Sequence, residues 1–121
     1  MDAGELETII ASDRIMSAVT WGVFRRSVLP KSFLPGAYVF NSRDAPGEHW
    51  LLLYVPNNAP IELYDSLNRS PVYYGLCPSI KTLPARLQGS DSSSCGLFVL
   101  FFLFWRSRGI DMHTLYLTLC T

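Results

Sequence analysis

The chain has 121 residues, of which 49% are hydrophobic, so it can form one small domain around a single core. Its 10 basic residues balance its 10 acidic ones, which gives no general electrostatic reason to bind nucleic acid or an anionic membrane. The 3 cysteines are an odd number without a dense framework, and the N-terminus lacks a basic start followed by an apolar run. We therefore expect a reducing, intracellular compartment.

The first half of the chain predicts a helix followed by strands. Leu6, Ile9 and Ile10 fall at helical spacing, which predicts an amphipathic helix over about residues 4 to 13. The apolar residues within 21–30 are interpreted as anchors of a loop, because prolines and a glycine follow them closely. Three short runs rich in β-branched, aromatic and leucine residues, each closed by turn-forming residues, predict three antiparallel strands, at 37–40, 50–55 and 61–64.

The second half of the chain predicts a central helix with smaller elements around it. Residues 66–86 predict one short helix, with a final strand near residues 83–87. Residues 96–105 are almost wholly apolar, so we expect a helix that the rest of the fold surrounds. This run has about half of the roughly 20 residues that a bilayer-spanning helix needs. Gly109 fits a helix stop, and Asp111 can cap a last short helix.

Cys95 stands at the expected N-terminus of the central helix. Residues 91–93, which can cap a helix, precede it, so its sulfur would lie near the positive end of the helix, where a thiolate is stabilised. An isolated cysteine is more commonly a small buried hydrophobic residue. Its interpretation as a nucleophile depends on three other residues, His49, Asp65 and Gln88.

These residues match the needs of a thiol protease, which are a base, a group that orients the base, and donors for the oxyanion. His49, at the mouth of a strand, is the candidate base, and Asp65, which closes the next strand, is the candidate orienting group. Gln88 is the candidate oxyanion donor, together with the backbone N–H of Cys95. Each has an ordinary alternative: His49 as a rim residue, Asp65 as a turn former and Gln88 as a surface amide.

Competing chemistries lack their motifs. There is no CxxC pair or His/Cys cluster with zinc spacing, so we expect neither a metal nor another cofactor. The glycines of residues 89–96 are not followed by the lysine of a P-loop, and no arginine follows Cys95 closely enough for a cysteine phosphatase. Ser94 lacks the first glycine of a serine-hydrolase elbow, because Ser92 occupies that position.

Four motifs together resemble the adenovirus-type processing proteases, the adenains, and more distantly the Ulp-type proteases of ubiquitin-like proteins. They are Gly47-Glu48-His49-Trp50, Leu63-Tyr64-Asp65-Ser66, Leu87-Gln88 and Ser93-Ser94-Cys95-Gly96-Leu97-Phe98. Segments 22–24, 29–30 and 35–39 are similar to adenain-like proteases of virus-like DNA transposons. The resemblance covers roughly residues 5 to 110.

The resemblance implies an α+β fold, in which a small antiparallel or mixed sheet packs on a central apolar helix that carries the nucleophilic cysteine at its N-terminus. It implies a single cysteine protease domain over residues 1–121, C-terminally short relative to the family. An aspartate at position 65 follows the Ulp-type pattern, since adenain has a glutamate there. The residues that this resemblance assigns are the base His49, its orienting Asp65, the oxyanion donor Gln88, the nucleophile Cys95, and the substrate-binding Trp50 and Gly96.

The implied activity is that of a monomeric cysteine endopeptidase that cleaves viral or virus-like precursor proteins after small, glycine-type residues. Two alternatives stay open: a deconjugating protease for a ubiquitin-like modifier, and a catalytically inactive interaction module with this fold. A protein or peptide is the expected substrate, and no membrane partner is expected. A peptide or DNA activator is implied by the resemblance alone, as is a virion or host-nucleus location if the protein is viral.

Overall fold

The computed structural model describes residues 1–43, 49–87, 89 and 94–120. It has a mixed α+β fold, which confirms the coarse fold class expected from the sequence. In chain order the elements are α1 (Ala3–Ala11), α2 (Arg14–Val19), β1 (Thr20–Phe24), η1 (Arg26–Val28), β2 (Gly36–Asn41), β3 (Trp50–Val55), β4 (Glu62–Tyr64), η2 (Pro71–Tyr74), β5 (Lys81–Thr82), α3 (Cys95–Arg106) and α4 (Met112–Cys120).

The described strands form one five-stranded sheet in the order β1-β2-β3-β4-β5. The pairs β2–β3 and β3–β4 are antiparallel, which confirms the three predicted antiparallel strands. Side chains of β3 alternate between the two faces: Leu52 joins the core under the helices, while Leu51 and Leu53 join a second core on the opposite face. Both faces of β3 are therefore covered, which explains why its sequence is almost continuously apolar.

Two expectations about the edges of the sheet are wrong. Residues 21–24, interpreted as a loop, belong to β1, which pairs in parallel with β2 and has an irregular register between Thr20 and Gly22. The predicted strand at 83–87 is absent, and β5 instead pairs Lys81 and Thr82 in parallel with β4. Pro84 has no N–H to donate to a ladder, so the strand ends before it.

The predicted first helix is confirmed as α1, and α2 is a further helix that the sequence analysis did not predict. Asp2 and Glu5 form a capping box at the start of α1, and Ser12 follows its last turn. Asp13 then accepts hydrogen bonds from the backbone N–H groups of Ile15 and Met16, which starts α2. Asp13, at the end of the predicted helix, is thus the cap from which the unpredicted α2 begins.

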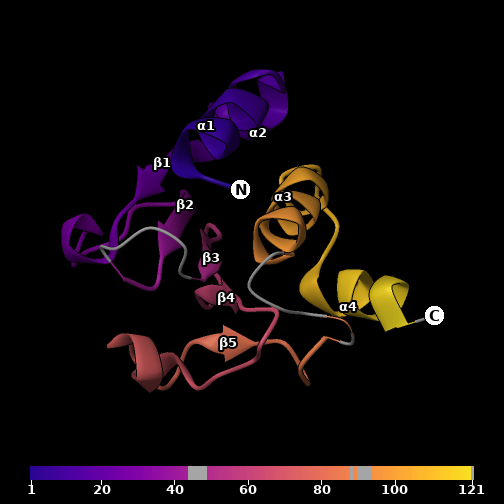
Figure 1. The fold of residues 1–121 in the computed structure, drawn as a ribbon. Coiled ribbons are helices and arrows are strands. Elements are labelled where there is room, and N and C mark those ends of the chain that lie inside the picture. The colour runs from indigo at the N-terminus through magenta and orange to yellow at the C-terminus, as the bar shows by residue number, and fades with distance from the viewer. Residues whose placement is uncertain (44–48, 88, 90–93, 121) are drawn as a thin grey trace.

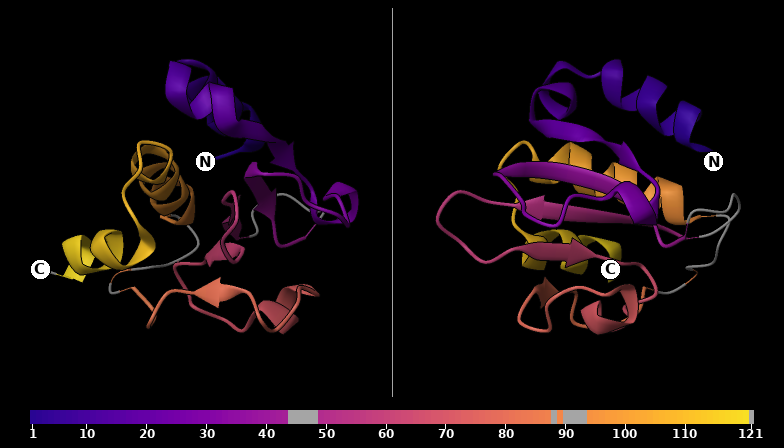
Figure 2. Two further views of the ribbon diagram at one scale, coloured as in Figure 1. Left: turned by 180° about the vertical axis from the view of Figure 1, so that it is seen from behind. Right: turned by 90° about the vertical axis from the view of Figure 1, so that its left-hand side faces the viewer.

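The helices and the irregular segments occupy opposite faces of the sheet. In Figures 1 and 2, α1 and α2 lie at the β1 end, α3 crosses the middle and α4 lies toward the β5 end, all on one face. The other face is covered by η1, η2 and the loops beside them, through Leu29 and Tyr74. The sheet is therefore the middle layer between a helical layer and a layer of loops.

Helix α3 packs one side against the sheet and leaves another side exposed. Cys95, Val99 and Phe102 point into the core, at the spacing of one helical face. Leu97 is 60% exposed and Trp105 is 42% exposed, so the expectation that protein surrounds this helix is wrong for that side. No helix among the described residues has the length and apolarity needed to cross a bilayer.

The chain turns after α3 as the sequence predicts. Gly109 adopts a left-handed φ of 95°, and Ile110 N–H donates to the carbonyl of Trp105. Asp111 then accepts a 2.8 Å hydrogen bond from the N–H of Thr114, which begins α4. Both predicted signals, the glycine stop and the aspartate cap, are confirmed.

A buried polar cluster ties the end of α3 to β4. The carboxylate of Glu62 accepts 2.9 Å and 3.4 Å bonds from the guanidinium of Arg106, and a 2.7 Å bond from the hydroxyl of Tyr64. The Arg106 guanidinium also lies 4.5 Å from the centre of the Tyr54 ring. Because Glu62 is only 5% exposed, its charge depends on these donors in place of water.

Replacement of Arg106 by methionine should therefore destabilise the fold. Arg106→Met leaves the buried Glu62 carboxylate without its counter-ion, and we expect a loss of about 3 kcal/mol in the free energy of unfolding, measured with urea. Adding Glu62→Gln to the same chain should restore most of the loss, because the unpaired charge is then gone. A loss below about 1 kcal/mol in the single variant would show that the ion pair has no part in fixing α3.

Candidate active site

His49 and Asp65 lie close together because His49 precedes β3, Asp65 follows β4, and the antiparallel register brings these two strand ends together. Leu52 pairs with Tyr64, so Asp65 lies one residue beyond the ladder and His49 lies diagonally across from it. The Nε2 atom of His49 is 2.5 Å from Oδ1 of Asp65. His49 is 4% exposed and Asp65 is 2% exposed, so the contact is closed to water.

Asp65 is held by four donors. Its Oδ1 accepts from His49 and from the N–H of Leu67 at 3.0 Å. Its Oδ2 accepts from the hydroxyl of Tyr74 at 2.6 Å and from the N–H of Arg69 at 3.0 Å. Its backbone carbonyl also closes a turn with the N–H of Asn68, so the alternative role of Asp65 as a turn former is realised together with its contact to His49.

Cys95 is the first residue of α3 and is 2% exposed. Its Sγ accepts a 3.3 Å hydrogen bond from the backbone N–H of Trp50, the residue that follows His49. The first-turn N–H groups of a helix have no partner within the helix, so they point partial positive charge toward this end. The thiol thus lies where strand β3 begins and where the positive end of α3 is directed.

The imidazole of His49 has one nitrogen for each neighbour. Since Nε2 donates to the Asp65 carboxylate, Nδ1 is the nitrogen that takes and returns a proton. Nδ1 is buried and forms no hydrogen bond with a nitrogen or oxygen atom of the described residues. After Asp65, Cys95 is the second titratable group whose interaction raises the pKa of this ring. Hydrogen bonds between catalytic groups are often long until substrate binds.

The pKa values of the three groups move in the directions that a thiolate–imidazolium pair requires. Burial alone would lower the pKa of His49, but its interactions with Asp65 and then Cys95 outweigh burial and raise the pKa to about 9. Burial alone would raise the pKa of Cys95, but His49 and the N–H groups of Trp50 and Gly96 lower it. For Asp65, the bonds from His49 and Tyr74 outweigh burial and lower its pKa.

These shifts define a pH window for the charged pair. The folded-state pKa of His49, about 9, is above its ordinary value of 6.5, so its protonated form stabilises the fold fully below about 6.5. That contribution is lost as the pH rises through 9. The lowered pKa of Cys95 and the raised pKa of His49 both favour the charged pair, and the pair ends on the alkaline side when His49 loses its proton.

Trp50 and Gly96, the predicted substrate-binding residues, both lie next to Met1. The indole Nε1 of Trp50 donates a 2.8 Å hydrogen bond to the carbonyl of Met1. A Cβ on residue 96 would lie 3.2 Å from the Cβ of Met1 and 3.4 Å from its sulfur, so glycine leaves the space that Met1 uses. The two predicted substrate-binding residues are thus both close to Met1, Trp50 through its carbonyl and Gly96 through its side chain.

Gln88, the predicted oxyanion donor, and residues 91–93, the predicted caps, lie outside the described residues. The neighbouring Leu87 is described: it packs in the core under the helices, and its N–H donates 2.9 Å to the carbonyl of Ser66. The described residues contain no group of three His, Cys, Asp or Glu side chains that could hold a metal ion. Cys77 and Cys120 are free and exposed.

Tyr74 is a site residue that the sequence analysis missed. It comes from η2, within the mixed segment 66–86, and its ring is buried on the face opposite α3 while its hydroxyl reaches Asp65. Burial and then the Asp65 bond raise the pKa of this hydroxyl, so it stays protonated as a donor. The only available signal was a tyrosine between Pro71 and Gly75, which predicts a turn but not a partner.

Removal of the Tyr74 hydroxyl should weaken the fold in a pH-dependent way. The lowered pKa of Asp65 means that its charged form contributes stability above its unfolded value, near 4, and that this is lost as the pH falls through the folded value. Tyr74→Phe removes one donor to that charge, so we expect a loss of about 2 kcal/mol at pH 7 that shrinks below about pH 4, measured by urea unfolding.

Tyr73→Phe is the matched control, because Tyr73 is 66% exposed and adjacent in the chain. Its stability should stay within about 0.5 kcal/mol of the wild type at every pH. A loss in Tyr74→Phe that is the same at pH 7 and at a pH low enough to protonate Asp65 would show that the hydroxyl does not act on the Asp65 charge.

The site therefore combines, in a buried arrangement, a thiol from the start of α3 with an imidazole and a carboxylate from the residues that flank β3 and β4. No protein-family model matches the chain, and a comparison with curated proteins finds no matching sequence. What the site does is therefore inferred from its own geometry and from the motifs of the sequence.

Proposed function

We propose that the chain is a cysteine endopeptidase of the adenain type. The observation that carries the proposal is the buried His49–Asp65 contact of 2.5 Å beside a thiol at a helix N-terminus, with the pKa of His49 raised and that of Cys95 lowered. A histidine or a cysteine with only a structural role does not require a raised or a lowered pKa. Together they favour an ionised nucleophile and a charged proton donor.

The residues divide the reaction into two steps. The Cys95 thiolate attacks the carbonyl carbon of the scissile peptide bond, and the carbonyl electrons move onto oxygen. As this intermediate collapses, the C–N bond breaks, His49 gives its Nδ1 proton to the departing amine, and a thioester with Cys95 remains. His49 then takes a proton from water, the hydroxide attacks the thioester, and the released thiolate and imidazolium restore the pair.

The oxyanion of each intermediate needs fixed donors. The backbone N–H of Cys95, in the first turn of α3, is one proposed donor, because the positive end of the helix favours charge that develops there. Gln88 is the second by resemblance. Asp65 keeps its charge throughout and holds the imidazole in the orientation and tautomer that the proton transfers require.

We propose small, glycine-type residues before the scissile bond. Trp50 is fixed beside His49 by sequence adjacency, and its indole N–H bonds a peptide carbonyl, at present that of Met1. Gly96 leaves space opposite, which a larger residue would fill. A branched substrate side chain between the Trp50 indole and position 96 would be disfavoured by overpacking, at about 1 to 3 kcal/mol. Viral or virus-like precursor proteins are the proposed substrates, on the resemblance alone.

One observation favours a second candidate, the inactive interaction module. Cys95 and His49 are 2% and 4% exposed, and a thiol so covered does not reach a substrate backbone without some displacement of its surroundings. The protease proposal therefore requires substrate to displace what covers the site, whereas the module requires nothing to move. Reaction with a substrate-like probe separates the two.

A vinyl sulfone peptide ending in Gly-Gly should label Cys95 of the wild-type chain and spare Cys77 and Cys120, as read by peptide mapping. The matched probe ending in Leu-Leu should react about tenfold more slowly, because branched side chains would overpack the proposed contact between Trp50 and Gly96. His49→Ala should abolish the fast labelling, since the thiolate loses its counter-ion. Labelling of the two exposed cysteines with Cys95 untouched would support the module, and equal rates for both probes would reject the glycine preference.

A further inference from the structure

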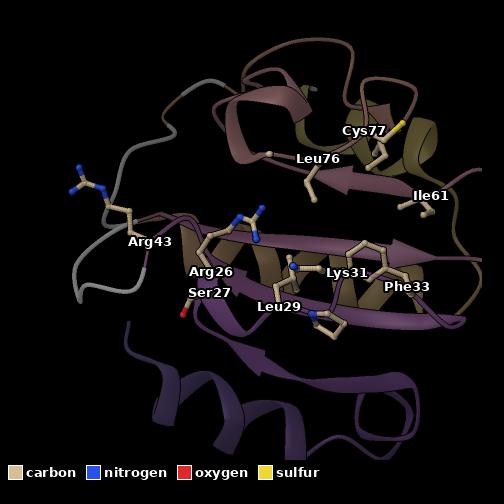
Figure 3. A pocket seen from close by; sticks show the side chains of 13 residues that line it. Arg26, Ser27, Leu29, Lys31, Phe33, Arg43, Ile61, Leu76 and Cys77 are labelled. Carbon is tan, nitrogen blue, oxygen red and sulfur yellow. The ribbon is translucent and has the colours of Figure 1, made fainter.

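A cavity of about 950 Å³ lies on the sheet face opposite α3. One wall comes from η1 and the loop after it, with Leu29 and Phe33, and the other from the segment after η2, with Leu76 (Figure 3). Ligand pockets in proteins usually enclose about 300 to 1,000 Å³, so this one has room for several residues of a peptide. It lies across the sheet from Cys95 and has no part in the chemistry described above.

The cavity is apolar in its walls and cationic toward one end. The apolar side chains of Leu29, Phe33, Ile61, Leu76 and Ile80 line it, together with the cations Arg26, Lys31 and Arg43. None of its described lining residues is acidic. Figure 3 shows Arg26 and Arg43 toward one end and Phe33 and Ile61 toward the other. A ligand that matches this pattern carries a negative charge at one end and a large apolar group at the other.

Arg26 is held in place within the wall. Its Nε donates a 2.8 Å hydrogen bond to the carbonyl of Tyr74. The next residue, Gly75, has a left-handed φ of 74°, and a Cβ there would lie 2.8 Å from Nη2 of Arg26. Glycine at position 75 is thus needed both for the turn and for the guanidinium. A guanidinium fixed in this way is ready to receive a carboxylate with little loss of side-chain entropy.

We propose that this cavity is a docking site for a short peptide segment of a partner protein, with an acidic residue next to a large apolar residue. Five apolar side chains, of which only Phe33 is aromatic, suit leucine or phenylalanine better than stacked bases, which need aromatic platforms. The hydroxyls of Ser27 and Ser32 add polar groups suited to a peptide backbone. The net charge of zero gives no long-range attraction for a nucleic acid. This inference does not rest on the proposed protease function.

The probe for the test is a fluorescein-labelled pentapeptide, Gly-Asp-Leu-Phe-Gly, titrated with the full chain carrying Cys95→Ser and followed by anisotropy. We expect saturable binding with a Kd below about 100 μM, weakened about tenfold when Asp is replaced by Lys and about fivefold when Phe is replaced by Ala. These comparisons leave the protein unchanged, so folding defects do not enter. Equal binding of the Lys peptide, or no binding up to about 1 mM, would overturn the proposal.

The protein variants locate the binding. Lys31→Glu and Arg43→Glu should each weaken binding about fivefold, and Arg14→Glu, a matched change of an exposed arginine on α2 outside the cavity, should leave it unchanged. Equal effects of all three would show that net charge and not this cavity attracts the peptide, which rejects the site. Displacement of the peptide by laurate or by a single-stranded oligonucleotide of equal concentration would show a ligand of another class, and would likewise reject it.

Discussion

The contact between His49 and Asp65 is the interaction on which the proposed chemistry depends. Two groups that would prefer water are enclosed within the fold, and burial opposes the charge on each of them. They remain charged because Asp65 receives three further hydrogen bonds and because His49 has a second negative partner in Cys95. Loss of any one donor would leave the remaining charges without full compensation.

The fold supplies this contact through its sheet and its central helix. The β3–β4 register brings the two side chains to one edge, and α3 begins at that same edge with its positive end directed at the thiol. Tyr74 belongs to the opposite face, yet its hydroxyl bonds Asp65 and its carbonyl holds Arg26 in the wall of the cavity. One residue of η2 therefore contacts both the site of the proposed chemistry and the proposed docking site.

The sequence predicted the centre of this fold better than its edges. Strands β2, β3 and β4 have strong apolar patterns closed by turns, and the ends of β3 and β4 placed His49 and Asp65 near each other in advance. Strand β1 was missed because a parallel edge strand of five residues, with Gly22 in its middle, has no pattern that separates it from an anchored loop. Tyr74 was missed because its role depends on packing against a distant part of the chain, which no local spacing encodes.

The proposed thiolate–imidazolium pair of Cys95 and His49 depends on the pKa of His49, which can be measured. With His113→Gln, His49 is the single histidine of the chain, and its imidazole can be titrated by NMR without ambiguity. We predict that His49 keeps its proton up to a pKa of about 9, and that replacement of Asp65 by asparagine moves the midpoint down toward 6.5 or below. A midpoint at or below 6.5 in the chain that retains Asp65 and Cys95 would contradict the thiolate–imidazolium pair.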